Sequence, residues 1–130
     1  MSGPVRRPAA RAGNTAGDPR RSNQTDPEVI DQVYVGALTL DLLLGDVRSL
    51  KQKRSVVRPI IAEVHKHFPA VAVAETGGND LHRRAEIGVA VVSGSAANCT
   101  QVLDQCERLV AGRPEIELLS ARQRIFHDED

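Results

Sequence analysis

Residues 70–92 read AVAVAETGGNDLHRRAEIGVAVV and hold two apolar runs on either side of a Gly-Gly pair. In the second run, large aliphatic residues occupy every second position from Ile87 to Val91. This alternation is typical of a strand with one buried face. The residues between the runs include Gly, Asn and Asp, which favour turns. The stretch therefore predicts a β-hairpin with strands at 70–75 and 84–92.

The segments outside this hairpin predict one further strand and one helix on each side. Residues 33–44 and 115–126 are β-rich, and residues 49–68 and 95–111 have helical apolar spacing. The apolar positions expected on the first helix are Leu50, Val57, Ile61, Val64 and Phe68. The order β-α-β-β-α-β predicts an α+β, ferredoxin-like sandwich over residues 31–127. Its four-stranded antiparallel sheet would carry both helices on one face.

The first helix has clear end signals and one internal conflict. Ser49 is a favourable N-cap, and Pro69 stops the helix. Pro59 lies inside it and removes a helical hydrogen bond. We therefore expect a kink at Pro59 or a helix that effectively begins late.

The composition and the charge distribution limit the possible domain organisation and location of the protein. The chain has 130 residues, with 17 Lys and Arg against 17 Asp and Glu. Residues 1–30 are rich in Arg, Pro and Gly and poor in large aliphatic residues, which predicts a disordered tail. A nucleic-acid-binding arm and a targeting sequence are the alternatives. Residues 128–130 are an acidic end. The sequence has no apolar run of membrane-spanning length and no secretory signal, so we expect a cytoplasmic protein.

The first helix carries a concentration of positive charge. Lys51, Arg54, Arg58 and His65 fall within about 60° of arc on a helix that advances ~100° per residue. A basic ridge on a helix is suited to contact phosphates. The residues expected to bind RNA are Arg48, Lys51, Lys53, Arg54 and Arg58. A solvated charged face and a site for an acidic protein partner are the alternatives.

The predicted sheet has a second face that the helices do not cover. Its side chains are small and apolar, without the aromatic rings that stack RNA bases. Exposed apolar faces of this kind usually mark an interface, so we expect a homodimer or higher oligomer. The expected contact residues are Val35, Ala37, Ala72, Ala74 and Ala90.

A second group of polar residues surrounds the hairpin loop. This possible functional edge consists of Glu75, Asp80, His82, Arg83 and Arg84. A carboxylate, an imidazole and guanidinium groups can perform acid–base chemistry if a pocket holds them together. Structural ion pairs and partner binding are the other interpretations. The cysteine spacing predicts no disulfide, and we expect no catalytic residue, metal or cofactor.

Three segments together resemble the YlxP-like family, a bacterial family of uncharacterised function. Residues 49–57, SLKQKRSVV, are similar to its S-L-K-x-K-R-x-V-V signature. Residues 71–75, VAVAE, resemble its V-S-V-A-E strand. Residues 80–92, DLHRRAEIGVAVV, resemble its D-L-x-x-R-A-x-x-G-V-A-V-V block. The family often has Trp at the position of His82, and it commonly lacks Pro59 and a 1–32 tail.

The resemblance implies a ferredoxin-like fold, a cytoplasmic setting and a link to translation. In many bacteria the family is encoded beside genes for transcription termination, initiation and ribosome-binding factors. We therefore expect a non-enzymatic RNA- or ribosome-binding accessory factor in ribosome maturation or translation, which binds phosphates through the basic first helix. A small enzyme or ligand-binding protein and an oligomeric interaction module are the alternatives. The family motif directs attention to Lys51, Lys53, Arg54, Glu75, Asp80 and Arg84.

Overall fold

The computed structural model describes residues 32–78 and 81–128. The expected tail 1–30 and the end at 129–130 lie outside the described residues. The elements are β1 (Tyr34–Leu44), α3 (Leu50–His67), β2 (Ala72–Gly77), β3 (Arg84–Ser93), α4 (Ala96–Ala111) and β4 (Ile116–His127). The predicted β-α-β-β-α-β order is confirmed.

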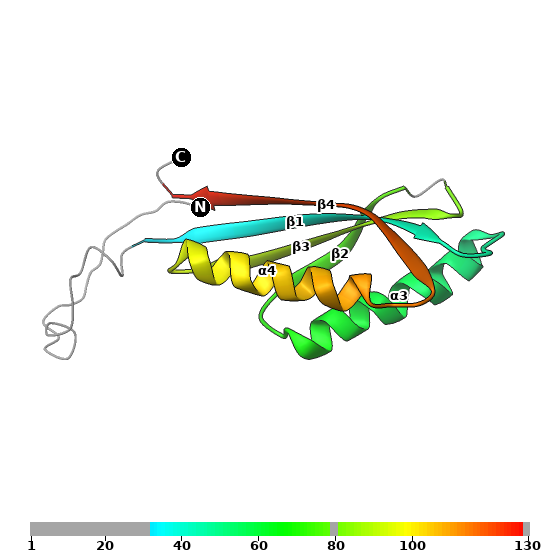
Figure 1. Ribbon diagram of the computed structural model, residues 1–130, viewed down its shortest axis with the longest axis horizontal. Helices are drawn as coiled ribbons and strands as arrows, with labels where there is room; N and C mark the ends of the chain where they lie inside the picture. The colour runs from blue at the N-terminus through cyan, green and yellow to red at the C-terminus, as the bar shows by residue number, and fades with distance from the viewer. Residues whose placement is uncertain (1–31, 79–80, 129–130) are drawn as a thin grey trace, which may run out of the picture. The chain divides into compact units, whose positions relative to one another are not determined.

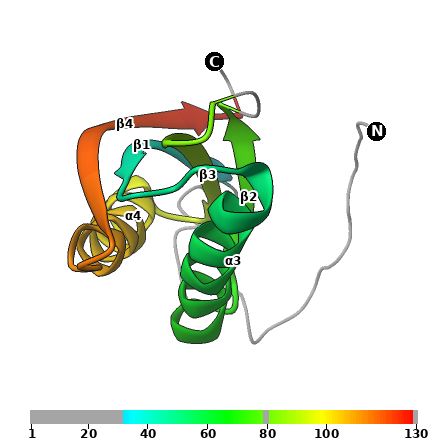
Figure 2. The same ribbon diagram turned by 90° about the vertical axis from the view of Figure 1, so that its right-hand side faces the viewer.

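The four strands form one antiparallel sheet in the order β2-β3-β1-β4. Both helices cover the same face of this sheet, α3 beside β2 and α4 beneath β1 (Figure 1). The view along the strands shows the opposite face without a helix (Figure 2). This arrangement is the predicted ferredoxin-like sandwich. We call the helix-free side the open face.

The core lies between the sheet and the two helices. Every second residue of β1 from Gly36 to Leu44 is buried, as the period of a strand requires. Gly36 lets α4 approach closely, because a Cβ there would lie 2.9 Å from Leu103 Cδ1 and 3.1 Å from Cys99 Cβ. Cys99 and Cys106 are both free and buried, and burial raises the pKa of the Cys106 thiol. They pack as core residues.

Helix α3 begins at the predicted cap and runs through Pro59. The Ser49 side chain accepts a hydrogen bond from the Gln52 amide at 3.1 Å. The helix is continuous from Leu50 to His67, so the expectation of a late start is wrong. Pro59 is exposed, and the only helical bond that it removes is the one to the Ser55 carbonyl.

The apolar stripe of α3 differs from the predicted one at its beginning. Leu50 is 42% exposed, whereas Ile60 is buried beside Val57 and Val64. The spacing from Val57 to Val64 therefore defines the face that packs on the sheet.

Arg113 joins the end of α4 to β4 and to α3. Its guanidinium donates to Glu115 Oε2 at 2.6 Å and pairs with Glu63. The hydrogen bond from Arg113 lowers the pKa of Glu115. A carboxylate with a lowered folded pKa stabilises the protein above its unfolded pKa of about 4.3, and this contribution is lost as the pH falls.

We expect Arg113→Met to lower the free energy of unfolding by no more than about 1 kcal/mol at pH 7, because the groups are partly exposed. The difference from the wild type should shrink as the pH falls toward about 3, because the contribution of the Arg113–Glu115 pair is lost as the Glu115 carboxylate becomes protonated. Urea denaturation at both pH values measures it. An equal difference at the two pH values would show that Arg113 acts through packing alone.

Candidate functional site

The basic ridge of α3 is exposed, as the sequence predicts. Lys51, Arg54, Arg58 and His65 all lie on the solvent side of the helix. None of them makes an ion pair within the described residues. The single acidic residue of this helix, Glu63, forms an ion pair with Arg113. We use the term basic ridge for Lys51, Arg54, Arg58 and His65.

Arg48 precedes the helix and is less available than the ridge. It is exposed, but its Nε lies 3.1 Å from Asp46 Oδ1, which partly neutralises its charge. Its amide donates to Gln52 Oε1 at 2.6 Å, so its backbone helps to cap α3.

Lys53 is not on the exposed surface, and its expected contact with RNA phosphates is therefore corrected. Its exposed fraction is 2%, and its side chain enters the space between α3 and the β2–β3 hairpin. The Nζ donates to the Leu81 carbonyl at 3.0 Å and to the Gly78 carbonyl, and lies 3.3 Å from Glu75 Oε2. An ammonium has three donors, and here each has a partner.

This arrangement explains how a lysine can be buried. Charged side chains are almost never fully buried without a partner. Glu75 supplies the opposite charge and remains 26% exposed, while two carbonyls of the loop complete the ammonium shell. Lys53 thus fixes the hairpin loop to α3. The sequence indicated the burial of Lys53, because this residue lies four positions before Val57 and therefore on the same, buried face of the helix.

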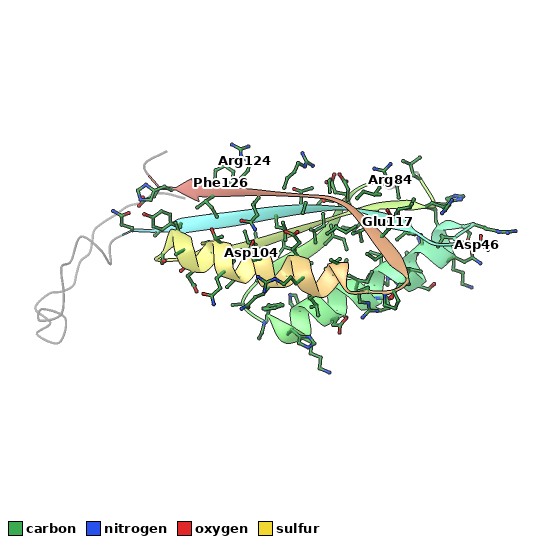
Figure 3. The ribbon with its side chains drawn as sticks, viewed as in Figure 1. Asp46, Arg84, Asp104, Glu117, Arg124 and Phe126 are labelled. Atoms are coloured by element: carbon green, nitrogen blue, oxygen red, sulfur yellow. The ribbon has the colours of Figure 1, made fainter. Side chains whose placement is uncertain are left out.

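The residues of the possible functional edge do not converge. Glu75 turns toward α3 and Lys53, whereas Arg84 lies on the open face of the sheet (Figure 3). Arg83 Nε donates to the Gly45 carbonyl at 3.0 Å and so ties the hairpin to the end of β1. His82 is exposed, and Asp80 lies outside the described residues. Glu75 forms a structural ion pair, with Lys53, whereas Arg83 holds the hairpin through hydrogen bonds to backbone carbonyls.

The described residues contain neither a cluster of metal ligands nor a membrane-spanning helix. No group of three or more His, Cys, Asp or Glu side chains within 32–78 and 81–128 could hold a metal ion. Neither described helix is long and apolar enough to cross a membrane.

A groove follows the flank of α3 where the helix borders β2. It has a volume of about 570 Å³. The apolar side chains Ile61, Ala62 and Val73 line it, together with the basic residues Arg58, His65 and Lys66. Sequence reasoning identified the ridge but not this groove, because the groove requires β2 to lie beside α3.

The open face combines an apolar end with charges of both signs. Val35 lies between Val92 and Phe126 in the register of the sheet, and these neighbours are 67% and 40% exposed. Arg124 stacks on Phe126 with its Cζ 4.8 Å from the ring centroid (Figure 3). The face also holds the predicted small apolar residues Ala37, Ala72, Ala74 and Ala90, which line a shallow hollow.

The fold and these surfaces define a ferredoxin-like α+β domain with an exposed basic ridge on helix α3. Residues 35–123 match a family described as a protein of unknown function, DUF503, and the chain belongs to this family. A curated relative is the uncharacterized protein YlxP of Bacillus subtilis (strain 168). It is 30% identical over 92 residues, which cover 71% of this chain and 99% of the relative.

Two solved structures of designed proteins are also similar. De novo designed protein Foldit4 is 12% identical with a TM-score of 0.42, over 73% of this chain and 96% of the design. De novo designed protein LFR1 1, with a ferredoxin fold, is 14% identical with a TM-score of 0.41, over 72% and 83% of the two chains.

The three segments that carry the family resemblance meet at one side chain. Lys53 comes from the first segment, Glu75 from the second and Leu81 from the third. Part of the family signature in this chain therefore builds the fold, whereas Lys51 and Arg54 of the same signature remain free at the surface.

Proposed function

We propose that this protein is a non-enzymatic RNA-binding accessory factor that contacts ribosomal RNA or a ribosomal subunit through the basic ridge of α3. The observation that carries the proposal is that the ridge cations are exposed and have no ion-pair partner among the described residues. The translation setting implied by the family resemblance supports the same assignment. We propose the cytoplasm as its location for the same reason.

The spacing of the ridge suits several phosphates at once. Lys51 and Arg58 are separated by about 10 Å along the helix axis, taking a rise of about 1.5 Å per residue. Arg54 lies between them on the same side. Cations that are already paired would first have to leave their carboxylates, whereas these can bind phosphates directly.

We expect Lys51→Glu with Arg54→Glu to weaken ribosome or RNA binding strongly while the fold stays intact. The affinity of the wild type should fall with salt at a log–log slope of about −2, for about three phosphate contacts on a single strand. Binding should depend little on sequence, because the basic ridge itself carries no Phe, Tyr or Trp side chain on which a base could stack. Co-sedimentation with ribosomal subunits at two salt concentrations measures both effects.

Single reversals provide a matched control. Arg54→Glu should weaken binding, whereas Arg108→Glu on α4 makes the same charge change on the other helix and should have little effect. Glu75→Gln should leave binding nearly unchanged. Equal losses for Arg54→Glu and Arg108→Glu would show non-specific attraction and would refute a defined ridge.

We also propose that a second copy of this chain covers the open face. The face carries Arg122 and Arg124 on β4, and the carboxylates Asp41 and Glu86 opposite each other on β1 and β3. Ser120 and Thr76 donate hydrogen bonds to these carboxylates at 2.9 and 2.8 Å. A surface with both signs of charge and an apolar patch can pair with itself in an isologous dimer.

A further inference from the structure

Strand β2 leaves one of its edges open. It pairs with β3 on one side, and no described strand pairs with its other side. Such an edge presents backbone N–H and C=O groups to any extended chain. Residues Ala72, Val73 and Ala74 are small or medium-sized and uncharged, so they do not obstruct this edge.

The other edge of the sheet is protected. Strand β4 is interrupted by a register shift opposite Asp41 and Leu42, and it carries Arg122 and Arg124. Bulges and charged side chains are common means of blocking an added strand.

Strand β2 also has a register shift, between Glu75 and Gly77. Its residues Ala72, Val73 and Ala74 precede this shift and carry no charge, so this part of the β2 edge can accept an added strand.

The surface beside β2 carries basic side chains on its helix side and small apolar side chains on its open-face side. On the helix side lies the groove with an apolar floor and the basic side chains of Arg58, His65 and Lys66. None of these three side chains makes an ion pair with any described residue. On the open-face side, Ala72 and Ala74 border the shallow hollow. Side chains of an added strand alternate between these two sides.

We propose that the β2 edge and the adjoining groove bind an extended, acidic peptide segment of a partner protein by strand addition. The backbone of the peptide pairs with β2, its acidic side chains reach Arg58, His65 and Lys66, and its aliphatic side chains lie beside Ala72 and Ala74. This mode takes its affinity from main-chain hydrogen bonds and its specificity from alternate side chains. The inference goes beyond RNA binding and adds a protein partner. This partner would share Arg58 and His65 with the basic ridge and would border Ala72 and Ala74 of the open face.

Two other occupants fit less well. A second copy paired edge to edge through β2 would bring two sets of Arg58, His65 and Lys66 together, and like charges repel. Single-stranded RNA can meet the cations, but it has no peptide groups to pair with the open edge of β2. An acidic peptide satisfies both the cations and the edge.

The test uses a labelled synthetic peptide of alternating valine and glutamate. Fluorescence anisotropy should show saturable binding to the wild-type protein. Lys66→Glu should weaken this binding by about tenfold, which corresponds to ~1.4 kcal/mol. Arg108→Glu, the same kind of change on α4, should have little effect. A peptide of alternating valine and lysine should not bind.

Backbone pairing is tested separately with the same valine–glutamate peptide N-methylated at alternate residues, prepared in both frames. One frame should lose binding, because its methyl groups remove the donors that face β2, and the other frame should keep it. Equal binding of both methylated forms, or no effect of Lys66→Glu, would overturn the proposal. If Lys66→Glu abolishes RNA binding and the peptide never binds, the groove belongs to the RNA surface and strand addition is wrong. Loss of RNA binding in the Lys51 and Arg54 variant with retained peptide binding would separate the two functions.

Discussion

Replacement of Lys53 by methionine should lower the free energy of unfolding by about 3 kcal/mol, the lower end of the cost of breaking a buried ion pair. Methionine removes the ammonium and leaves the Gly78 and Leu81 carbonyls and the Glu75 carboxylate without their shared donor. For a domain of this size the midpoint of thermal unfolding should fall by roughly 15 °C. Chemical and thermal denaturation measure the two quantities.

The neighbouring exposed lysine gives the control. Lys51→Met makes the same chemical change at the surface and should alter stability by less than about 0.5 kcal/mol. Hydrogen exchange should show faster exchange in the hairpin loop for Lys53→Met only, because the loop loses its attachment to α3. Equal stability of the two variants would mean that apolar packing of methionine fully replaces the buried pair.

The contribution of the Lys53–Glu75 ion pair to stability can be measured separately from that of the two carbonyl hydrogen bonds. A double-mutant cycle with Lys53→Met and Glu75→Gln isolates the interaction between the two side chains. We expect the Glu75 change alone to cost less, because its carboxylate is 26% exposed and glutamine keeps an acceptor oxygen. The two carbonyls should therefore account for a large part of the Lys53 contribution.

Much of the fold could be predicted because its signals are local. Ser49 and Ser95 cap the two helices, and the alternation of Ile87, Val89 and Val91 identifies the central strand. These features depend on neighbours in the sequence. Of the two expectations raised by Pro59, the late helix start is wrong, since a proline on the exposed side of a packed helix costs one hydrogen bond and leaves the preceding turns helical.

The site was predicted only in part because its remaining features depend on tertiary structure. The ridge of Lys51, Arg54 and Arg58 follows from helical spacing alone. The burial of Lys53 depends on where the hairpin loop lies, and a count of charges cannot separate it from its exposed neighbours. The groove beside β2 likewise exists only because strand order places β2 at the edge next to α3.

The family signature therefore serves two purposes in this chain. Lys53 and Glu75 bind the helix to the hairpin, whereas Lys51 and Arg54 remain available to ligands. Substitutions within one motif should consequently fall into two groups. Changes at Lys53 should reduce stability and, through it, every activity, and changes at Lys51 or Arg54 should reduce binding at unchanged stability.

The second large effect is expected from a substitution on the open face, which should disrupt self-association. We expect the wild-type protein to be a dimer at micromolar concentration, and Ala90→Arg to weaken the association by at least about a hundredfold. Ala90 lies between Ala37 and Ala72 in the register, so an arginine there would place a charge within the apolar rows. In a symmetric dimer the substitution occurs on both copies, which doubles the penalty.

Light scattering and sedimentation velocity measure the association, with Ala111→Arg as the matched control. Ala111 is exposed at the end of α4, on the helix side of the sheet, so the same substitution there should leave the dimer unchanged. Circular dichroism confirms that each variant keeps its fold. If the wild type is monomeric, or if both variants remain dimeric, the open face is not the contact surface. A dimer that dissociates only with Ala90→Arg would identify the open face, with the apolar rows around Ala90, as the surface through which the two copies meet.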